Sequence, residues 1–116
     1  MAGGSGVVPV VAMTRYARRL GLQDKLKVVV VARTWEDLPY AAELQRYGAF
    51  IALTRQNHGD RVAAPPYPDE LVDLVAGAER GYLCGSVGFA SYATRLLEDA
   101  GLASDTIRVE QFGETS

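Results

Sequence analysis

The chain alternates short apolar runs with longer stretches in which apolar residues recur every three or four positions. The short runs cover residues 25–32, 49–54, 80–84 and 106–112. Runs of this length are typical of strands, and a continuous β-branched run such as residues 28–31 is typical of a strand that is buried on both faces. The pattern therefore predicts four strands of a parallel sheet.

The longer stretches between these runs have the spacing of amphipathic helices. Helices are expected over residues 8–20, from Thr34 or Asp37 to about residue 47, over residues 68–76, and from residue 89 to residue 100. In the first helix, the expected apolar face consists of Val10, Met13, Tyr16, Ala17 and Leu20. In the last helix, the expected buried residues are Phe89, Tyr92, Ala93, Leu96, Leu97 and Ala100.

Strict alternation of helices and strands predicts an α/β fold, with a doubly wound parallel sheet between two layers of helices. The 116 residues suit one domain that spans residues 1–116, and no linker divides them. A hydrophobic content of 48% is sufficient for a packed core.

Charge and composition exclude several function classes. The net charge is −2, and the only basic cluster is Arg15, Arg18 and Arg19, so we expect no nucleic-acid partner. Cys84 and His58 are the only cysteine and histidine, which excludes an internal disulfide and a Cys/His metal centre. The sequence shows no signal peptide and no membrane-spanning stretch, so we expect a cytoplasmic protein without a membrane partner.

Candidate chemistry gathers where the predicted strands end. Arg33-Thr34, Arg55 and Cys84-Gly85 each follow or end a strand, and ligands of open parallel sheets bind beyond these carboxyl ends. The glycine-rich stretch from Gly3 to Gly6 comes before a predicted helix. Its free N–H groups would favour a phosphate, but only two residues precede the stretch.

Five stretches together resemble the nicotinamide-nucleotide-binding domain of the ferredoxin–NADP reductase family. They are residues 2–9, residues 32–38 with Glu43-Leu44, residues 53–55, Cys84-Gly-Ser-Val-Gly-Phe89, and residues 107–112. They occur in the order typical of the family and cover nearly the whole chain. The resemblance implies a sheet with strand order 3-2-1-4-5.

The resemblance also implies roles for individual residues. The pyrophosphate of the dinucleotide would lie on Gly3, Gly4, Ser5, Gly6 and Pro9. The nicotinamide would lie beside Cys84 and Gly85, in the motif that Phe89 completes, with Glu110 near the nicotinamide and the flavin. The positions that hold the 2′-phosphate of NADP in the family are matched by Arg33, with Thr34 beside it, and by Arg55 and Arg61. NADP is therefore slightly favoured over NAD. An arginine fork suits a phosphate.

By this resemblance, NAD(P)H would deliver hydride to FAD or FMN on a separate flavin-binding domain, and electrons would pass to an iron–sulfur or haem partner. The isolated chain would be inactive. Two features depart from the family: its first strand is apparently missing, and the Arg-x-Tyr-Ser/Thr segment that holds flavin is absent. The chain therefore resembles an excised domain, a split product or the product of a late start codon.

Other interpretations remain open at this point. Cys84 is equally explained as a small buried residue, Glu110 and the three arginines as surface charges, and His58 as a solvated loop residue. The whole chain is alternatively a non-catalytic nucleotide-binding or interaction module with a doubly wound fold, or a flavodoxin-like module that binds no nicotinamide.

Overall fold

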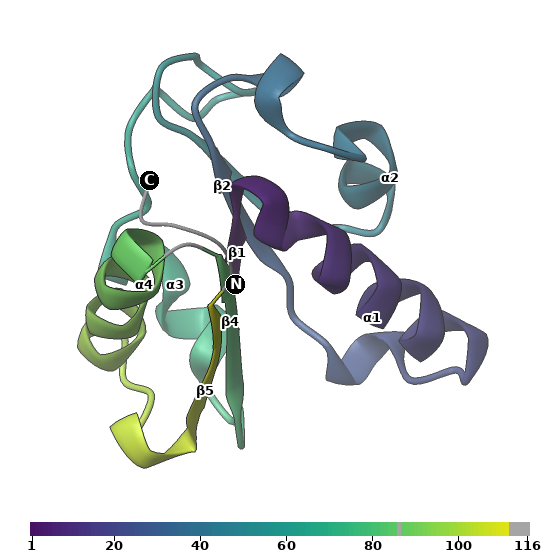
Figure 1. Cartoon of the computed structure of the whole chain (residues 1–116), viewed down its shortest axis with the longest axis vertical. Coiled ribbons are helices and arrows are strands. Elements are labelled where there is room, and N and C mark those ends of the chain that lie inside the picture. The colour runs from purple at the N-terminus through teal and green to yellow at the C-terminus, as the bar shows by residue number, and fades with distance from the viewer. Residues whose placement is uncertain (86, 112–116) are drawn as a thin grey trace.

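A single parallel sheet forms the centre of the computed structural model, which describes residues 1–85 and 87–111 (Figure 1). Its strands are β1 (Ala2–Gly3), β2 (Val29–Ala32), β3 (Phe50–Leu53), β4 (Gly81–Gly85) and β5 (Ile107–Gln111). They lie in the order β3-β2-β1-β4-β5 and are all parallel. The predicted fold class and strand order are thus confirmed. Phe112, predicted to end the last strand, and Ser86 lie outside the described residues.

Helices cover both faces of the sheet. The helices α1 (Val7–Arg19) and α2 (Ala41–Arg46) lie on one face, and α3 (Pro68–Val75) and α4 (Val87–Asp99) lie on the other (Figure 1). Short 3-10 turns lie next to the strands: the first joins β1 to α1, the second and third flank β2, and the fourth precedes β5. They are η1 (Gly4–Gly6), η2 (Gln23–Lys25), η3 (Trp35–Asp37) and η4 (Ser104–Thr106).

The sheet separates two hydrophobic cores, because neighbouring residues of a strand point to opposite faces. Val30 and Cys84 belong to the core beneath α1 and α2, whereas Val29 and Leu83 belong to the core beneath α3 and α4. The first core also contains Ala2, Val7, Val10, Val11, Leu38, Ala41, Leu44, Ile51 and Leu53. The second also contains Leu71, Ala93, Leu96, Leu97, Ala100 and Leu102.

The sequence predicts that the first strand of the family is missing. The structure contains this strand as β1, so the prediction is wrong. Ala2 is fully buried between Val30 of β2 and Cys84 of β4. The backbone of Met1 extends the pairing, since its nitrogen lies 2.7 Å from the carbonyl of Tyr82 and its carbonyl accepts from Cys84 N–H at 3.1 Å. A strand of two residues is too short to show an apolar pattern.

The apolar face predicted for the first helix is also wrong in part. Tyr16 and Leu20 are 57% and 53% exposed. The buried stripe is Val7, Val10, Val11 and Thr14, which have the i, i+3, i+4, i+7 spacing of one helix face. Thr14 can lie in this stripe because its hydroxyl donates to the carbonyl of Val10 at 2.8 Å. Tyr92, predicted to be buried in the last helix, is 40% exposed.

The single helix predicted up to residue 47 is divided into η3 and α2. Pro39 disfavours helical geometry at the residue before it, and Leu38 is accordingly extended. Tyr40 then has a φ of 57°, in the left-handed region, and α2 begins at the next residue.

An ion pair joins α1 to α2. The guanidinium of Arg15 donates two hydrogen bonds to the carboxylate of Glu43, at 2.7 and 2.6 Å. The hydroxyl of Tyr47 donates a further bond to the same carboxylate at 2.8 Å. These bonds lower the pKa of Glu43 to about 2, with Arg15 as the main cause.

Candidate functional site

The carboxyl ends of β1 and β4 form the point where the direction of winding changes. The two strands are neighbours in the sheet, yet α1 follows β1 on one face and α4 follows β4 on the other. Helices that depart to opposite faces leave a crevice between their amino ends, and ligands of doubly wound sheets bind in this crevice. The structure therefore brings the Gly3–Gly6 segment and Gly85, at the end of β4, to one end of adjacent strands.

The first glycine segment allows close approach of the backbone. Gly4 has a φ of 57°, which side-chain-bearing residues rarely adopt. A Cβ atom on Gly3 would lie 2.7 Å from two ring carbons of Phe89, at the start of α4. Gly3, one of the residues predicted to hold pyrophosphate, thus lies against Phe89 of the cysteine motif, although the two are distant in sequence.

The amino end of α1 is suited to an anion. Gly6 is its N-cap and has no side chain to cap the first N–H groups, and Ser5 lies in η1 before it. Pro9 is in the first turn, as predicted, where a missing N–H has no consequence for the helix. No acidic residue lies in the first turn of α1 or of α4, so the positive ends of both helix dipoles are uncompensated there.

Cys84 and Glu110 are neighbours across the sheet. Their Cα atoms are register partners on β4 and β5, and Ala2 is the partner of Cys84 on the other side. Cys84 is 2% exposed, and its burial raises the pKa of the thiol; the amino group of Met1 opposes this rise, and the Glu110 carboxylate adds to it. The thiol is therefore neutral at physiological pH and covered, whereas Glu110 is exposed.

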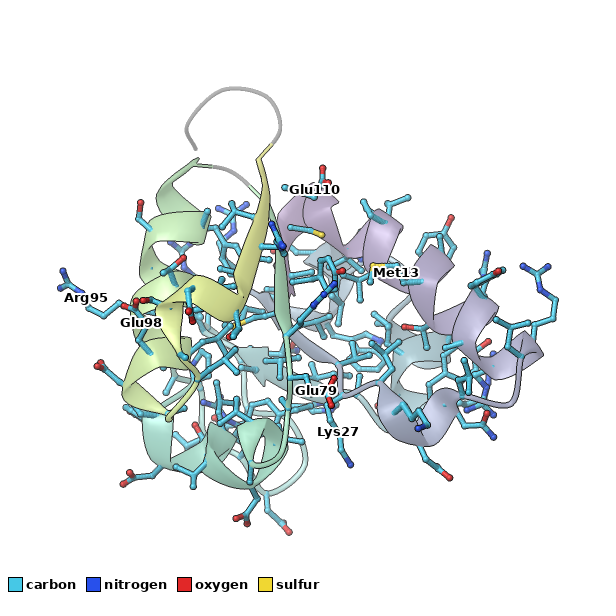
Figure 2. All side chains as sticks on the ribbon, turned by 90° about the horizontal axis from the view of Figure 1, so that it is seen from below. Met13, Lys27, Glu79, Arg95, Glu98 and Glu110 are labelled. Carbon is cyan, nitrogen blue, oxygen red and sulfur yellow. The ribbon has the colours of Figure 1, made fainter. Side chains whose placement is uncertain are left out.

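Figure 2 shows Glu110 at one end of the sheet, away from Glu79 and Lys27 at the other.

Arg33, Thr34 and Arg55 are brought together by the ends of β2 and β3. The N–H of Arg55 donates to the carbonyl of Arg33 at 2.9 Å, so the two arginines leave the sheet side by side. Arg33 and Arg55 are exposed. The hydroxyl of Thr34 lies 3.1 Å from the carboxylate of Asp37, an acidic residue whose place near Arg33 the sequence did not reveal.

Arg61 does not join this pair in the structure. Its guanidinium donates to both carboxylate oxygens of Glu70, at 2.8 and 2.9 Å. It also donates to the carbonyls of Ala64 and Pro65, at 2.8 and 2.9 Å. Its side chain is 16% exposed. These contacts hold the loop of residues 55–66 to the start of α3, which is a structural task.

A stacked pair of rings, Trp35 and His58, lies next to Arg33 and Arg55. The rings of Trp35 and His58 are 5.2 Å apart with an interplanar angle of 20°. His58 is half-buried, so this loop residue is only partly solvated. A cavity of about 340 Å³ borders the pair and is lined also by Gln45, Leu53, Gln56, Asn57 and Gly59. It offers an aromatic wall close to the arginines.

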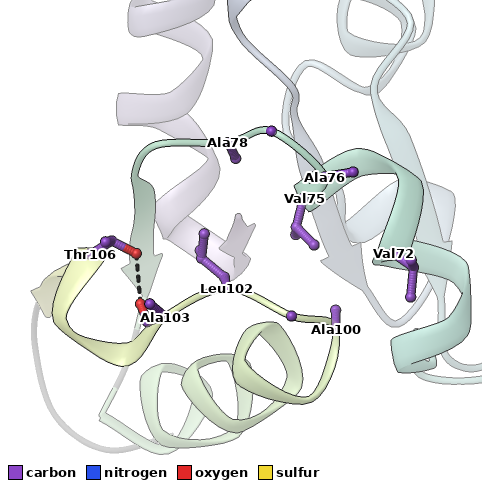
Figure 3. Close-up of a pocket in the computed structure, with 10 residues that line it drawn as sticks. Val72, Val75, Ala76, Ala78, Ala100, Leu102, Ala103 and Thr106 are labelled. Atoms are coloured by element: carbon purple, nitrogen blue, oxygen red, sulfur yellow. Dashed lines mark hydrogen bonds between the residues drawn. The ribbon is translucent and has the colours of Figure 1, made fainter.

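A further cavity lies at the opposite end of the sheet, between the carboxyl ends of α3 and α4 (Figure 3). Its volume is about 360 Å³, and residues such as Val72, Val75 and Leu102 line it. None of its lining residues is charged. Helix carboxyl ends repel anions, so this cavity is unsuited to a dinucleotide.

Among the described residues, no helix has the length and apolar character needed to cross a membrane. Within the same residues, no three His, Cys, Asp or Glu side chains are grouped so that they could hold a metal ion.

The chain is similar in structure to two proteins related to flavohaemoglobin. A flavohaemoglobin from Malassezia yamatoensis, solved with bound FAD and haem, has a TM-score of 0.69 and 23% identity, over 97% of this chain and 30% of that one. The flavohaem-like FAD/NAD-binding domain of nitric oxide dioxygenase from Vibrio cholerae O1 biovar El Tor has a TM-score of 0.73 and 20% identity, over 97% and 49%.

These similarities confirm the fold implied by the resemblance, a doubly wound parallel sheet with the strand order 3-2-1-4-5. The chain spans less than half the length of both solved chains. No protein-family model matches the sequence, and the search of curated proteins finds no match.

Proposed function

We propose that this chain is the nicotinamide-nucleotide-binding domain of a flavin-dependent reductase. The observation that carries the proposal is the meeting of the Gly3–Gly6 segment with the start of α4 at the carboxyl ends of β1 and β4, seen in the contact of Gly3 with Phe89. A dinucleotide needs a phosphate cradle, and a glycine segment at the amino end of a helix supplies its elements.

In the proposal, the pyrophosphate binds at the uncapped amino end of α1. Gly3, Gly4 and Gly6 have no side chain that would stand between the phosphates and the backbone, and Gly4 turns the chain with its positive φ. Ser5 and Pro9 complete the turn and the start of the helix. The partial positive charge of the helix end favours the phosphates.

The adenosine end of the nucleotide lies toward Arg33, Thr34 and Arg55. Two exposed guanidinium groups that leave neighbouring backbone positions support binding of a 2′-phosphate, so the slight preference for NADP over NAD is part of the proposal. Arg61 is removed from this group because Glu70 and two carbonyls use its donors.

The nicotinamide end lies toward Cys84, Gly85 and Glu110. The buried, neutral thiol of Cys84 acts through its small volume and leaves room for the ring above it. A flavin, FAD or FMN, would accept the hydride as two electrons and a proton and would pass the electrons on one at a time. The flavin-binding domain, a haem or iron–sulfur acceptor and a cytoplasmic location remain predictions for the protein of which this domain is a part.

The proposal is tested by NADP⁺ affinity in two matched variants, Gly4→Ala and Gly77→Ala. Both glycines have a positive φ, 57° and 78°, and a Cβ on either would meet nothing within 4 Å. Each substitution has a similar backbone cost of about 1–2 kcal/mol. We expect Gly4→Ala to weaken NADP⁺ binding at least about fivefold, because the loop must change shape, and Gly77→Ala to leave it unchanged. Equal affinities in the two variants would contradict the proposed phosphate loop.

A second test concerns the reaction. We expect the chain with NADPH to reduce no dye, and dye reduction to begin when a ferredoxin reductase-type flavin domain is added. Dye reduction by the chain alone would refute the division of labour between domains. Binding of nucleotide without restored electron transfer would favour the non-catalytic module instead.

A further inference from the structure

Asp37 faces the two residues that begin the proposed 2′-phosphate site. One of its carboxylate oxygens, Oδ2, accepts from the Thr34 hydroxyl at 3.1 Å and lies 3.8 Å from Arg33 Nε. The η3 turn causes this placement, because the N–H of Asp37 donates to the carbonyl of Thr34 at 3.1 Å and the chain returns toward the end of β2. The positive charge of Arg33 therefore already has a partner within the chain.

The carboxylate of Asp37 would affect nucleotides with and without a 2′-phosphate differently. A 2′-phosphate bound by Arg33 would bring a second anion next to Asp37, and the two like charges would repel. An unphosphorylated ribose carries no such charge, and its 2′-hydroxyl is a donor that a carboxylate can accept. Both Arg33 and Asp37 are solvent-exposed, at 65% and 48% of their side-chain surfaces, so screening keeps the effect moderate.

We propose that Asp37 is a specificity-determining residue that restrains the preference of this site for 2′-phosphorylated nucleotides. The inference rests on the proposed function, because it assumes that the adenosine end lies at Arg33. It goes further in assigning the balance between NAD and NADP to an acidic residue that competes with the phosphate for Arg33 and Thr34.

The test compares the affinities of 2′-phospho-AMP and AMP in Asp37→Asn by calorimetry. Asparagine keeps the shape and an acceptor for the Thr34 hydroxyl but removes the charge. Loss of one exposed like charge near a phosphate should raise the ratio of the two affinities about three- to tenfold. Glu36→Gln is the matched control, since it removes an exposed acid from the same η3 turn. We expect the control to change the ratio less than about twofold.

The dependence on Arg33 is tested by repeating Asp37→Asn in an Arg33→Ala background, where the change in the ratio should disappear. An unchanged ratio in Asp37→Asn, or the same change in Glu36→Gln, overturns the inference while the proposed function stands. A change that persists without Arg33 also overturns it. Absence of binding of both nucleotides in every variant contradicts the proposed function, and the inference with it.

Discussion

The substitution Arg61→Ala separates a structural arginine from a ligand-binding one. Arg61 donates four hydrogen bonds, two to Glu70 and two to backbone carbonyls, and the side chains of the ion pair are only 16% and 27% exposed. An exposed pair contributes at most about 1 kcal/mol, and breaking a buried one costs about 3–5 kcal/mol. The Arg61–Glu70 pair is partly buried, so Arg61→Ala should lower the free energy of unfolding by about 2 kcal/mol.

Urea denaturation measures this loss. With a slope of about 1–3 kcal/mol/M, a loss of about 2 kcal/mol moves the unfolding midpoint by about 0.7–2 M. We expect Arg61→Ala to keep the affinity of the folded chain for 2′-phospho-AMP. Arg55→Ala is the control, because an exposed residue should change stability by less than about 0.5 kcal/mol while affinity falls.

The same variant has a predictable pH dependence. The hydrogen bonds from Arg61 are the main cause of the lowered pKa of Glu70 in the folded chain. A carboxylate with a depressed folded pKa stabilises the protein above its unfolded pKa, about 4.3, and this contribution is lost as pH falls through the folded value. The stability difference between the wild type and Arg61→Ala should thus be full at pH 7 and shrink in acid. A fall in affinity without a fall in stability would refute the structural assignment.

Three further predictions follow from particular contacts. Gly3→Ala should destabilise the chain by about 1–3 kcal/mol in urea denaturation, because the new Cβ overlaps the ring of Phe89; unchanged stability would show that the ring moves aside freely. Cys84 should resist iodoacetamide at pH 8 in the native chain and react in urea, because burial covers the thiol and raises its pKa; rapid labelling of native protein, followed by mass spectrometry, would contradict this. The carboxyl of Glu43 should titrate near a pKa of about 2 by NMR and return toward its ordinary value in Arg15→Gln. The ionised Glu43 therefore stabilises the fold above a pH of about 4.3, and this contribution is lost as the pH falls toward 2. An unchanged pKa of Glu43 in Arg15→Gln would show that Arg15 is not the cause of the shift.

The sequence predicted those elements whose pattern is continuous and long. The run of β-branched residues in β2 and the helical spacing of α4 were recognisable because each buries apolar residues at a regular period. β1 was not recognisable, since two residues show no period and its place depends on pairing with β2 and β4. The break at Pro39 has a local cause, because proline disfavours helical geometry at the residue before it, but the apolar spacing alone predicts one helix across it.

The site shows the same division between local and long-range information. Gly4 and Gly6 could be predicted because glycine and a following helix start are local signals. The ion pair of Arg61 with Glu70 could not be predicted, because Glu70 is nine residues away and meets Arg61 only when the loop folds back. Asp37 was missed for another reason: it lies only four residues from Arg33, but the η3 turn that directs its carboxylate toward Arg33 was not predicted.

A map of backbone amide chemical shifts during titration with NADP⁺ tests directly whether the nucleotide binds at the carboxyl ends of the strands. We expect the amides of Gly4, Gly6 and Gly85 to shift together with one dissociation constant, because all three lie where β1 and β4 end. The amides of Gly77 and Gly101, which border the cavity at the opposite end, should stay in place. Shifts concentrated at Gly77 and Gly101, or none at Gly4, Gly6 and Gly85 at saturating nucleotide, would contradict a nicotinamide-nucleotide site at the carboxyl ends of the strands.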